Sequence, residues 1–296
     1  MKRLLSWSGA AVSVGPRVGA VVMTVAFVLG LSGVGLSGVG LSGVGLAAEP
    51  ESRADEASAP GPAPGPVVVE MFTSQGCGSC LPAEDVLADL AARPEVIALA
   101  LHVDYWDYIG WPDPYGKRAH TARQKAYVQR FSGRYLITPQ AVIDGREALA
   151  GTRPDGLETA LGRALAAPNT AHPRFVGGDP VQVAIPAAPN TGKATPKATG
   201  KATPKAPLNA TVWVLYYDRH RVDRVTRGEN AGKTLTHHNV VRDRQRLGTW
   251  DGTSARFTLD AEAAHARGRT GCAVIVQAHD NGPILGAARM DLPADS

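Results

Sequence analysis

Cys77 and Cys80 are separated by two residues and follow an apolar run by a short polar segment. That run, residues 67–72, is rich in β-branched side chains and predicts a buried strand, so Cys77 is expected at or just before a helix N-terminus, with Cys80 one turn further on. The free backbone N–H groups and the dipole there favour a thiolate, which is the reactive form of cysteine. We expect Cys77 to be the nucleophile and Cys80 to resolve the mixed disulfide.

A Cys-x-x-Cys pair also occurs in structural zinc sites and in structural disulfides. A structural zinc site needs a second pair of ligands, but the remaining cysteine is Cys272 and no second Cys-x-x-Cys or His-x(3–5)-His follows. A small structural disulfide or two idle thiols are further alternatives. The strand–turn–helix context favours redox chemistry over both. Cys272 begins an apolar stretch and is predicted to be a buried free thiol.

The composition is that of a globular protein: 296 residues, 44% hydrophobic and 20% charged. The formal charge of +4 includes Lys2, Arg3 and Arg17 near the N-terminus, and without these three it is +1. Four further lysines lie in the low-complexity segment described below. No basic footprint for nucleic acid remains after this subtraction.

Residues 1–48 are predicted to be a signal peptide or a membrane anchor. Residues 18–46 are apolar and uncharged, and Leu-Ser-Gly-Val-Gly occurs three times within them. Cleavage after Ala47 or Ala48 is favoured over retention because the glycines weaken a lipid-exposed helix. Both alternatives place the protein outside the cytoplasm, periplasmic or secreted, where disulfides persist. Residues 49–66 are predicted to be a disordered linker rich in Ala, Pro and Gly.

Residues 67–168 predict an α/β domain with the order β-α-β-α-β-β-α. Its elements are the strand at 67–72, a helix at 79–92, a strand at 96–103, a helix at 119–130, a strand at 135–145, a strand at 147–150 and a helix at 155–167. The second strand ends in two aspartates and several aromatic residues, at the end of the sheet where α/β proteins bind ligands. These residues predict a binding lip, with Asp104 or Asp107 relaying protons, or a loop anchored by packed aromatics.

Residues 169–296 predict a mostly β, sandwich-like domain with a low-complexity insertion at 186–207. Its expected strands are 172–185, 211–217, 221–227, 235–247, 255–259, 272–278 and 284–290. His237 and His238 are adjacent, so on a strand they face opposite sides and do not readily share one metal ion. The turn Arg-Gly-Glu-Asn-Ala-Gly at 227–232 fits either a functional loop or a tight turn that needs glycine.

The element order, with cysteines after the first strand and a proline opening the third, resembles the thioredoxin fold. The resemblance implies that the Thr138–Pro139 bond is cis, that this loop faces the cysteines, and that Thr138 offers its backbone to a substrate. Several phrases, among them Phe-Thr-Ser-Gln-Gly-Cys-x-Ser-Cys, His-Val-Asp-Tyr-Trp-Asp and Thr-Pro-Gln-x-Val-Ile-Asp-Gly, look like the secreted bacterial family called domain of unknown function 1223. Gly76 stands where thioredoxins have tryptophan, and Gly78-Ser79 stands between the cysteines in place of Gly-Pro.

The leading hypothesis is an exported thiol–disulfide oxidoreductase that acts on a protein or small-molecule thiol or disulfide. Cys77, Cys80, Thr138 and Pro139 would form its site, with Asp104 as a proton relay, and no cofactor or metal is needed. We expect no nucleic-acid partner, and membrane contact only through an uncleaved leader. The alternatives are a binding or adaptor protein with a structural disulfide, and a copper(I) protein that uses Cys77, Cys80 and His102.

Overall fold

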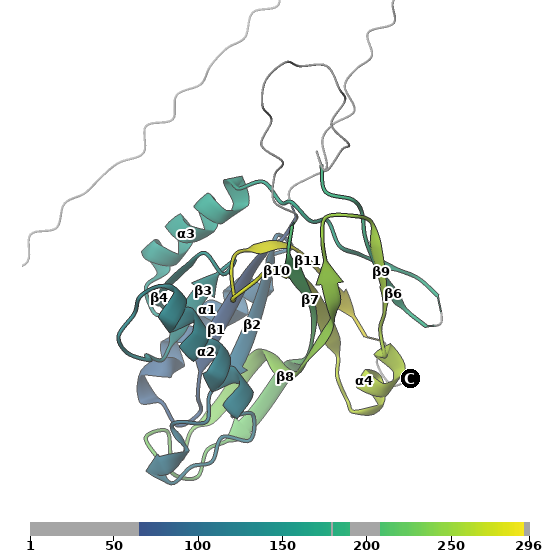
Figure 1. Cartoon of the computed structure of the whole chain (residues 1–296). Helices are drawn as coiled ribbons and strands as arrows, with labels where there is room; N and C mark the ends of the chain where they lie inside the picture. Colours follow the sequence, from purple (N-terminus) through teal and green to yellow (C-terminus); the bar gives the residue numbers. More distant parts are fainter. Residues whose placement is uncertain (1–64, 179, 190–207, 293–296) are drawn as a thin grey trace, which may run out of the picture. The chain divides into compact units, whose positions relative to one another are not determined.

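The computed structural model describes residues 65–178, 180–189 and 208–292 (Figure 1). The predicted leader, nearly all of the linker and most of the 186–207 insertion lie outside these ranges. The described chain has a mixed α/β fold with one large sheet in the strand order β11-β10-β7-β8-β2-β1-β3-β4 and a smaller sheet in the order β5-β6-β9. None of the helices in the described ranges combines the length and apolarity needed to cross a bilayer.

Two parallel strands form the centre of the first half. β1 pairs with β2 from Val67↔Val96 to Thr73↔His102, and every residue of both strands is buried, as their continuous apolar sequences predict. β1 pairs on its other side with β3, antiparallel, and β3 pairs with β4. The elements are β1 (Val67–Thr73), a 3₁₀ turn (Gly78–Cys80), α1 (Leu81–Ala91), β2 (Val96–His102), a second 3₁₀ turn (Asp107–Ile109), α2 (Arg118–Arg130), β3 (Gln140–Ile143), β4 (Glu147–Ala150) and α3 (Pro154–Ala166).

Helices cover both faces of these strands. α1 and α3 pack on one face, where Leu87 and Leu161 meet Val69 and Ala98. α2 lies on the other face, where Tyr127 packs with Phe72. Figure 1 shows this helix in front of β1 and β2. The alternation of side chains along each strand supplies apolar residues to both layers, so the cysteine-bearing end of β1 is held from two sides.

The strands of the second half extend the same sheet. β8 touches β2 through the single parallel pair Ala100↔Val240, and β7 and β10 continue outward from β8. The smaller sheet packs on the outer strands through a core that includes Val183, Val214 and Trp250. The elements are β5 (Arg174–Val176), β6 (Gln182–Ile185), β7 (Ala210–Arg224), β8 (Thr234–Trp250), β9 (Ala255–Thr258), α4 (Ala261–Ala266), β10 (Gly271–Ala278) and β11 (Ile284–Asp291).

Three local predictions for this fold need correction. The strand expected at 135–145 is reduced to β3, because the chain is irregular up to Pro139, which has no N–H to donate to a sheet. The strand expected at 221–227 is the end of β7, which stays paired with β8 through Arg224↔Thr234. α4 was not predicted. The boundary expected after residue 168 falls between α3 and β5, with the sheet continuous across it, and the division into two folding domains stays a prediction.

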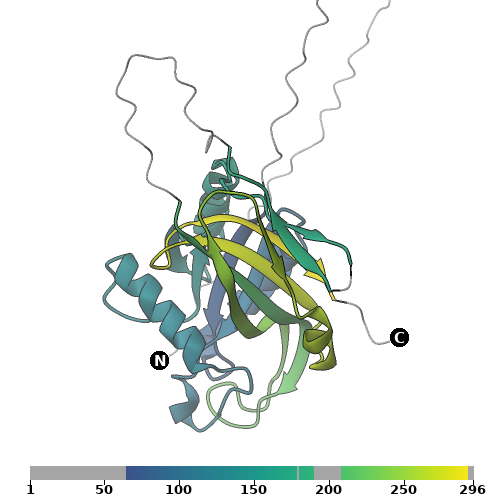
Figure 2. The ribbon, with the colours of Figure 1, turned by 45° about the vertical axis from the view of Figure 1, so that its right-hand side comes forward.

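The sheet bends so that its two ends meet. The backbone N–H of Ile284, at the start of β11, donates to the carbonyl of Asp144 in the β3–β4 turn at 2.7 Å. Arg123 of α2 closes the interior between them: its guanidinium pairs with Glu70 of β1 at 2.5 Å and donates to Gln277 of β10 at 3.1 Å. Figure 2 shows the two sheets and α2 around this bend. The buried ion pair therefore connects strands from both halves of the chain.

Asp144 in the β3–β4 turn gives a pH-dependent prediction. It adopts a left-handed φ of 47°, accepts a hydrogen bond from Val68 N at 2.7 Å, and is 4% exposed. Burial raises its pKa to about 6, so the folded state binds a proton more tightly than the unfolded chain and stability falls as pH rises from about 4 to about 6. Asp144→Asn keeps the acceptor and tolerates the turn without the buried charge.

We expect Asp144→Asn to gain stability relative to the natural protein by up to about 2–3 kcal/mol as pH rises from 4 to 7.5. Urea unfolding at the two pH values measures this difference. Asp280→Asn is the matched control, because Asp280 is an exposed aspartate with a similar φ of 55°. A natural protein that gains stability relative to the Asp144→Asn variant over this range would contradict the assignment.

Candidate functional site

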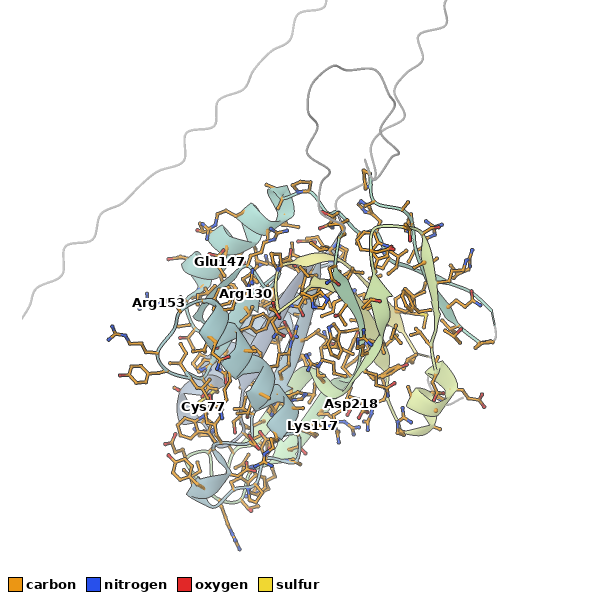
Figure 3. All side chains as sticks on the ribbon, in the orientation of Figure 1. Cys77, Lys117, Arg130, Glu147, Arg153 and Asp218 are labelled. Carbon is orange, nitrogen blue, oxygen red and sulfur yellow. A yellow bond between two sulfur atoms is a disulfide. The ribbon has the colours of Figure 1, made fainter. Side chains whose placement is uncertain are left out.

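The two cysteines form a disulfide at the start of α1. Cys77 caps the 3₁₀ turn that leads into the helix, Cys80 caps the helix itself, and their Cα atoms are 5.4 Å apart. The backbone N–H of Cys77 donates to Ser74 O at 3.1 Å, which tightens the turn after β1. Because β1 and β2 are parallel, the loop lies at the same end of the sheet as Lys117, which precedes α2 (Figure 3).

The loop before β3 faces the disulfide. The Thr138–Pro139 bond is cis, as the resemblance implies. Thr138 Oγ1 lies 3.4 Å from Cys77 Sγ, and its carbonyl oxygen lies 3.8 Å from the same sulfur. Ser79, between the cysteines, donates to that carbonyl at 3.3 Å, and Trp106 Nε1 donates to Thr138 Oγ1 at 2.7 Å. The structure thus brings Cys77, Cys80, Thr138 and Pro139 together.

The β7–β8 turn closes the other side of the cysteine loop. The buried amide of Asn230 donates to the carbonyls of Gln75 and Cys77, at 2.9 and 3.1 Å. Glu229 accepts from the backbone N–H of Gly78 at 2.8 Å. Gly228 has a φ of +74°, and a Cβ there would stand 3.1 Å from Ile109. Glycine allows the tight turn that was one of the two alternatives for this segment, and its polar residues hold the cysteine loop, whereas a functional role for the turn stays a prediction.

A buried polar cluster lies beneath the loop. His102, the last residue of β2, has its Nδ1 2.8 Å from Asp113 Oδ2, and Gln75 N donates to the same oxygen at 2.7 Å. Burial favours the neutral form of Asp113, but His102 and the backbone N–H groups of Gln75 and Tyr115 outweigh it and hold its pKa at about 2. Burial alone lowers the pKa of His102, and Asp113 outweighs burial so that the pKa is raised.

Asp104 lies in a different environment from the cysteines. Its carboxylate accepts a hydrogen bond from Thr121 Oγ1 of α2 at 2.5 Å, so its observed partner is the helix start. Asp107 accepts from Asp113 N at 3.1 Å, and burial is the main cause that raises its pKa. These hydrogen bonds hold both aspartates within the loop between β2 and α2. A proton relay through Asp104 stays a prediction.

Aromatic and apolar side chains are exposed on the Thr138 side. Tyr108 is 81% exposed and stacks on Trp106, whose indole holds Thr138. Tyr135 is 78% exposed and Ile137 45%, both just before the cis bond. The residues after β2 predict a binding lip, and Tyr135 and Ile137, which that pattern does not include, are exposed on the same side as Tyr108. Their position before a Thr-Pro pair is the signal that could have indicated this exposure.

The histidines of β8 behave as the strand geometry predicts. The ring of His237 lies 5.0 Å from that of His102, inside the cluster, whereas His238 lies 5.5 Å from His220. Within the described ranges, potential metal ligands converge at Glu84, His102 and His237. Neither cysteine belongs to that group, so His102 is gathered with another histidine and a carboxylate.

The comparisons with known proteins identify a family. A family described as protein of unknown function (DUF1223) matches residues 68–277, and the chain belongs to this family. A crystal structure of an Agrobacterium tumefaciens protein, solved by a structural genomics consortium, is similar with a TM-score of 0.63 and 28% identity. The match covers 78% of this chain and 96% of that one. No curated protein matches this chain in sequence.

Asn230 provides a prediction for this site. Replacing it with alanine removes the side-chain donor to the carbonyls of Gln75 and Cys77, of which Cys77 O keeps its bond from Cys80 N, and this costs about 1–3 kcal/mol of unfolding free energy. The detached turn also uncovers the disulfide, so dithiothreitol reduces it faster. Lys233→Ala is the control, because Lys233 is exposed and its Nζ donates to the amide oxygen of Asn230 at 3.1 Å, so the change leaves both bonds from the Asn230 amide nitrogen in place. Equal reduction rates in Asn230→Ala and the natural protein would show that the turn does not cover the disulfide.

Proposed function

We propose that this protein is an exported thiol–disulfide oxidoreductase with a thioredoxin-like domain. Support comes from the order β1-α1-β2-α2-β3-β4-α3, with parallel β1 and β2 and antiparallel β3. The observation that carries the proposal is the contact between Cys77 Sγ and Thr138, next to the cis bond, at the N-terminus of α1. A sulfur there can be attacked while a substrate backbone lies along residues 137–138.

The reaction needs only the two sulfurs and the substrate. A substrate thiolate attacks Cys77 Sγ, the Cys77–Cys80 bond breaks, and its electron pair leaves on Cys80, which takes up a proton. The second substrate thiol loses its proton and attacks the substrate sulfur of the mixed disulfide, and the electron pair leaves on Cys77, which takes up the second proton. The substrate loses two electrons and two protons, which the protein dithiol gains. The reverse sequence reduces a substrate disulfide.

The exposed apolar residues near Thr138 favour a polypeptide thiol or disulfide as substrate. Tyr108, Tyr135 and Ile137 offer a surface for an extended chain. The extracytoplasmic location is part of the proposal and rests on the apolar sequence at 18–46 and on the compartments where disulfides persist. The proposed reaction uses no organic cofactor.

Trapping variants test the proposed reaction. Cys80→Ser lacks the resolving sulfur, so when its Cys77 thiolate attacks a partner disulfide in a bacterial periplasm and one partner sulfur leaves as a thiolate, the mixed disulfide should accumulate. Non-reducing electrophoresis and mass spectrometry detect them. Cys77→Ser should trap nothing, and Cys272 does not interfere because it is buried and burial raises the pKa of its thiol to about 12. A folded Cys80→Ser protein with no mixed disulfides would remove the main support for the proposal.

Glu229 gives a second test of the reduced enzyme. Its carboxylate holds the backbone N–H of Gly78 and places a negative charge beside the loop where the Cys77 thiolate forms. Glu229→Gln keeps an acceptor without the charge, so reduced protein should react with iodoacetamide about two- to fivefold faster at pH 7 and low salt. Added salt should shrink the difference. Glu262→Gln, an exposed change on α4, is the control. A slower reaction in Glu229→Gln would contradict this role.

The burial of the disulfide favours a second candidate function. Cys77 is 0% exposed and Cys80 1%, which suits a structural disulfide in an extracytoplasmic binding or adaptor protein. In that case a Cys77→Ser/Cys80→Ser protein would lose thermal stability but keep its activity in the cell. The oxidoreductase proposal expects loss of that activity even in a variant that remains folded.

A further inference from the structure

Three potential metal ligands converge beneath the cysteine loop from separate elements. Glu84 lies in the first turn of α1, His102 ends β2, and His237 lies in β8. One carboxylate oxygen and one ring nitrogen from each histidine lie within 4.8 Å of one another. Both histidine side chains are 0% exposed, and the Glu84 side chain is 12% exposed. The group is thus almost closed to solvent.

The three atoms that face one another are also without hydrogen-bond partners. Glu84 Oε2, His102 Nε2 and His237 Nδ1 are three of the four buried side-chain nitrogen and oxygen atoms left unsatisfied in the described part of the chain. His237 Nδ1 is 3.1 Å from Glu84 Oε2, but this contact lacks hydrogen-bond geometry. An unsatisfied buried polar group costs about 1–3 kcal/mol, so three at one point need an explanation. A bound cation would satisfy all three.

The opposite atom of each side chain already has a partner. His102 Nδ1 pairs with Asp113 at 2.8 Å, which directs Nε2 into the cluster. Glu84 Oε1 accepts from Thr73 Oγ1 at 3.3 Å, and His237 Nε2 lies 3.1 Å from the amide nitrogen of Gln75. Metal-binding histidines characteristically have their second nitrogen held by a carboxylate or another polar group. The Asp113–His102 pair matches that arrangement.

We propose that Glu84, His102 and His237 bind a divalent transition-metal ion, with Zn²⁺ the best match. Two imidazoles and one carboxylate suit Zn²⁺, whereas Ca²⁺ and Mg²⁺ take oxygen ligands and copper(I) prefers sulfur. Tetrahedral ligands about 2.0–2.2 Å from Zn²⁺ stand roughly 3.4 Å apart, so the group closes by a small rotation, which the partly exposed Glu84 allows. A metal ion on Nδ1 would leave the proton of His237 on Nε2, so the Gln75 amide nitrogen, now 3.1 Å from Nε2, would have to move away.

The site would join three elements that support the cysteine loop. Glu84 is one helical turn after Cys80, and β8 begins just after the turn that contains Asn230. The ion would therefore fix the start of α1 against β2 and β8. Zinc binding here is independent of the proposed redox reaction, because the sulfurs are not ligands and the disulfide can remain intact.

Metal titration of the disulfide-bonded protein tests the proposal. Protein treated with a chelator and then dialysed should bind one Zn²⁺ by calorimetry, unfold at a higher temperature with Zn²⁺, and give visible absorption bands with Co²⁺. Glu84→Gln and His237→Gln should each weaken Zn²⁺ binding by at least about 10–100-fold, the effect that outer-shell changes already have. Asp85→Asn and His238→Gln, their neighbours in sequence, should retain the natural affinity.

The outcomes separate this site from the cysteines. Binding that persists in Cys77→Ser/Cys80→Ser supports the proposal, and binding lost only in that variant overturns it. No binding by the natural protein, or unchanged affinity in both Glu84→Gln and His237→Gln, also overturns it. Circular dichroism confirms that each variant is folded, and Glu84→Gln is the more conservative change because Glu84 is partly exposed. Failure of the trapping experiment leaves this result unaffected.

Discussion

The amide of Asn230 is the contact on which the cysteine loop depends. The chain that leaves β1 turns sharply, and the carbonyls of Gln75 and Cys77 lie in this turn, where Cys77 O also accepts from Cys80 N at 3.2 Å. Asn230, from the β7–β8 turn, supplies a donor to each, at 2.9 and 3.1 Å. Buried carbonyls need such partners, and here a residue more than 150 positions away in the chain provides them. The cysteine loop therefore requires the second half of the protein.

The same constraint explains the long β7–β8 hairpin. β8 pairs with β2 at only one position, Ala100↔Val240, yet β7 and β8 stay paired beyond it to Arg224↔Thr234. This extension brings Asp223 and His237 next to the side chain of Gln75, and it brings Asn230 next to the carbonyls of the cysteine loop. Asp223 accepts from Tyr115 at 2.6 Å and from Gln75 at 3.2 Å. Polar contacts therefore join the two halves of the chain at this end of the sheet, as the Arg123–Glu70 pair and Gln277 do within the bend.

The local sequence pattern predicts most helices and strands, but it does not predict the contacts between residues that are far apart in the chain. The buried strands β1 and β2, the helices and the turn at Asp144–Gly145 follow from apolar runs, prolines and glycines, which act within a few residues. The Cys-x-x-Cys pair and Pro139 were predicted as neighbours through the resemblance. The partners of the site do not follow from local pattern: the turn that contains Asn230 fits either a functional loop or a tight turn, and His237 is unsuited to metal when only its neighbour His238 is considered. The spacing of residues along the chain does not determine which strands become neighbours in the sheet.

The arrangement also separates two roles that one sequence stretch suggested. His102 and the aspartates after β2 were expected near the sulfurs, as relays or copper ligands. His102 instead faces Glu84 and His237, while Thr138, Ser79 and Trp106 surround Cys77. The sulfurs therefore lie among hydroxyl, carbonyl and aromatic groups, with the Glu229 carboxylate beside the loop, whereas Glu84, His102 and His237 form a separate group. The reactivity of the sulfurs would therefore be controlled by the residues that surround Cys77. The cluster of Glu84, His102 and His237 would control how rigidly the cysteine loop is held.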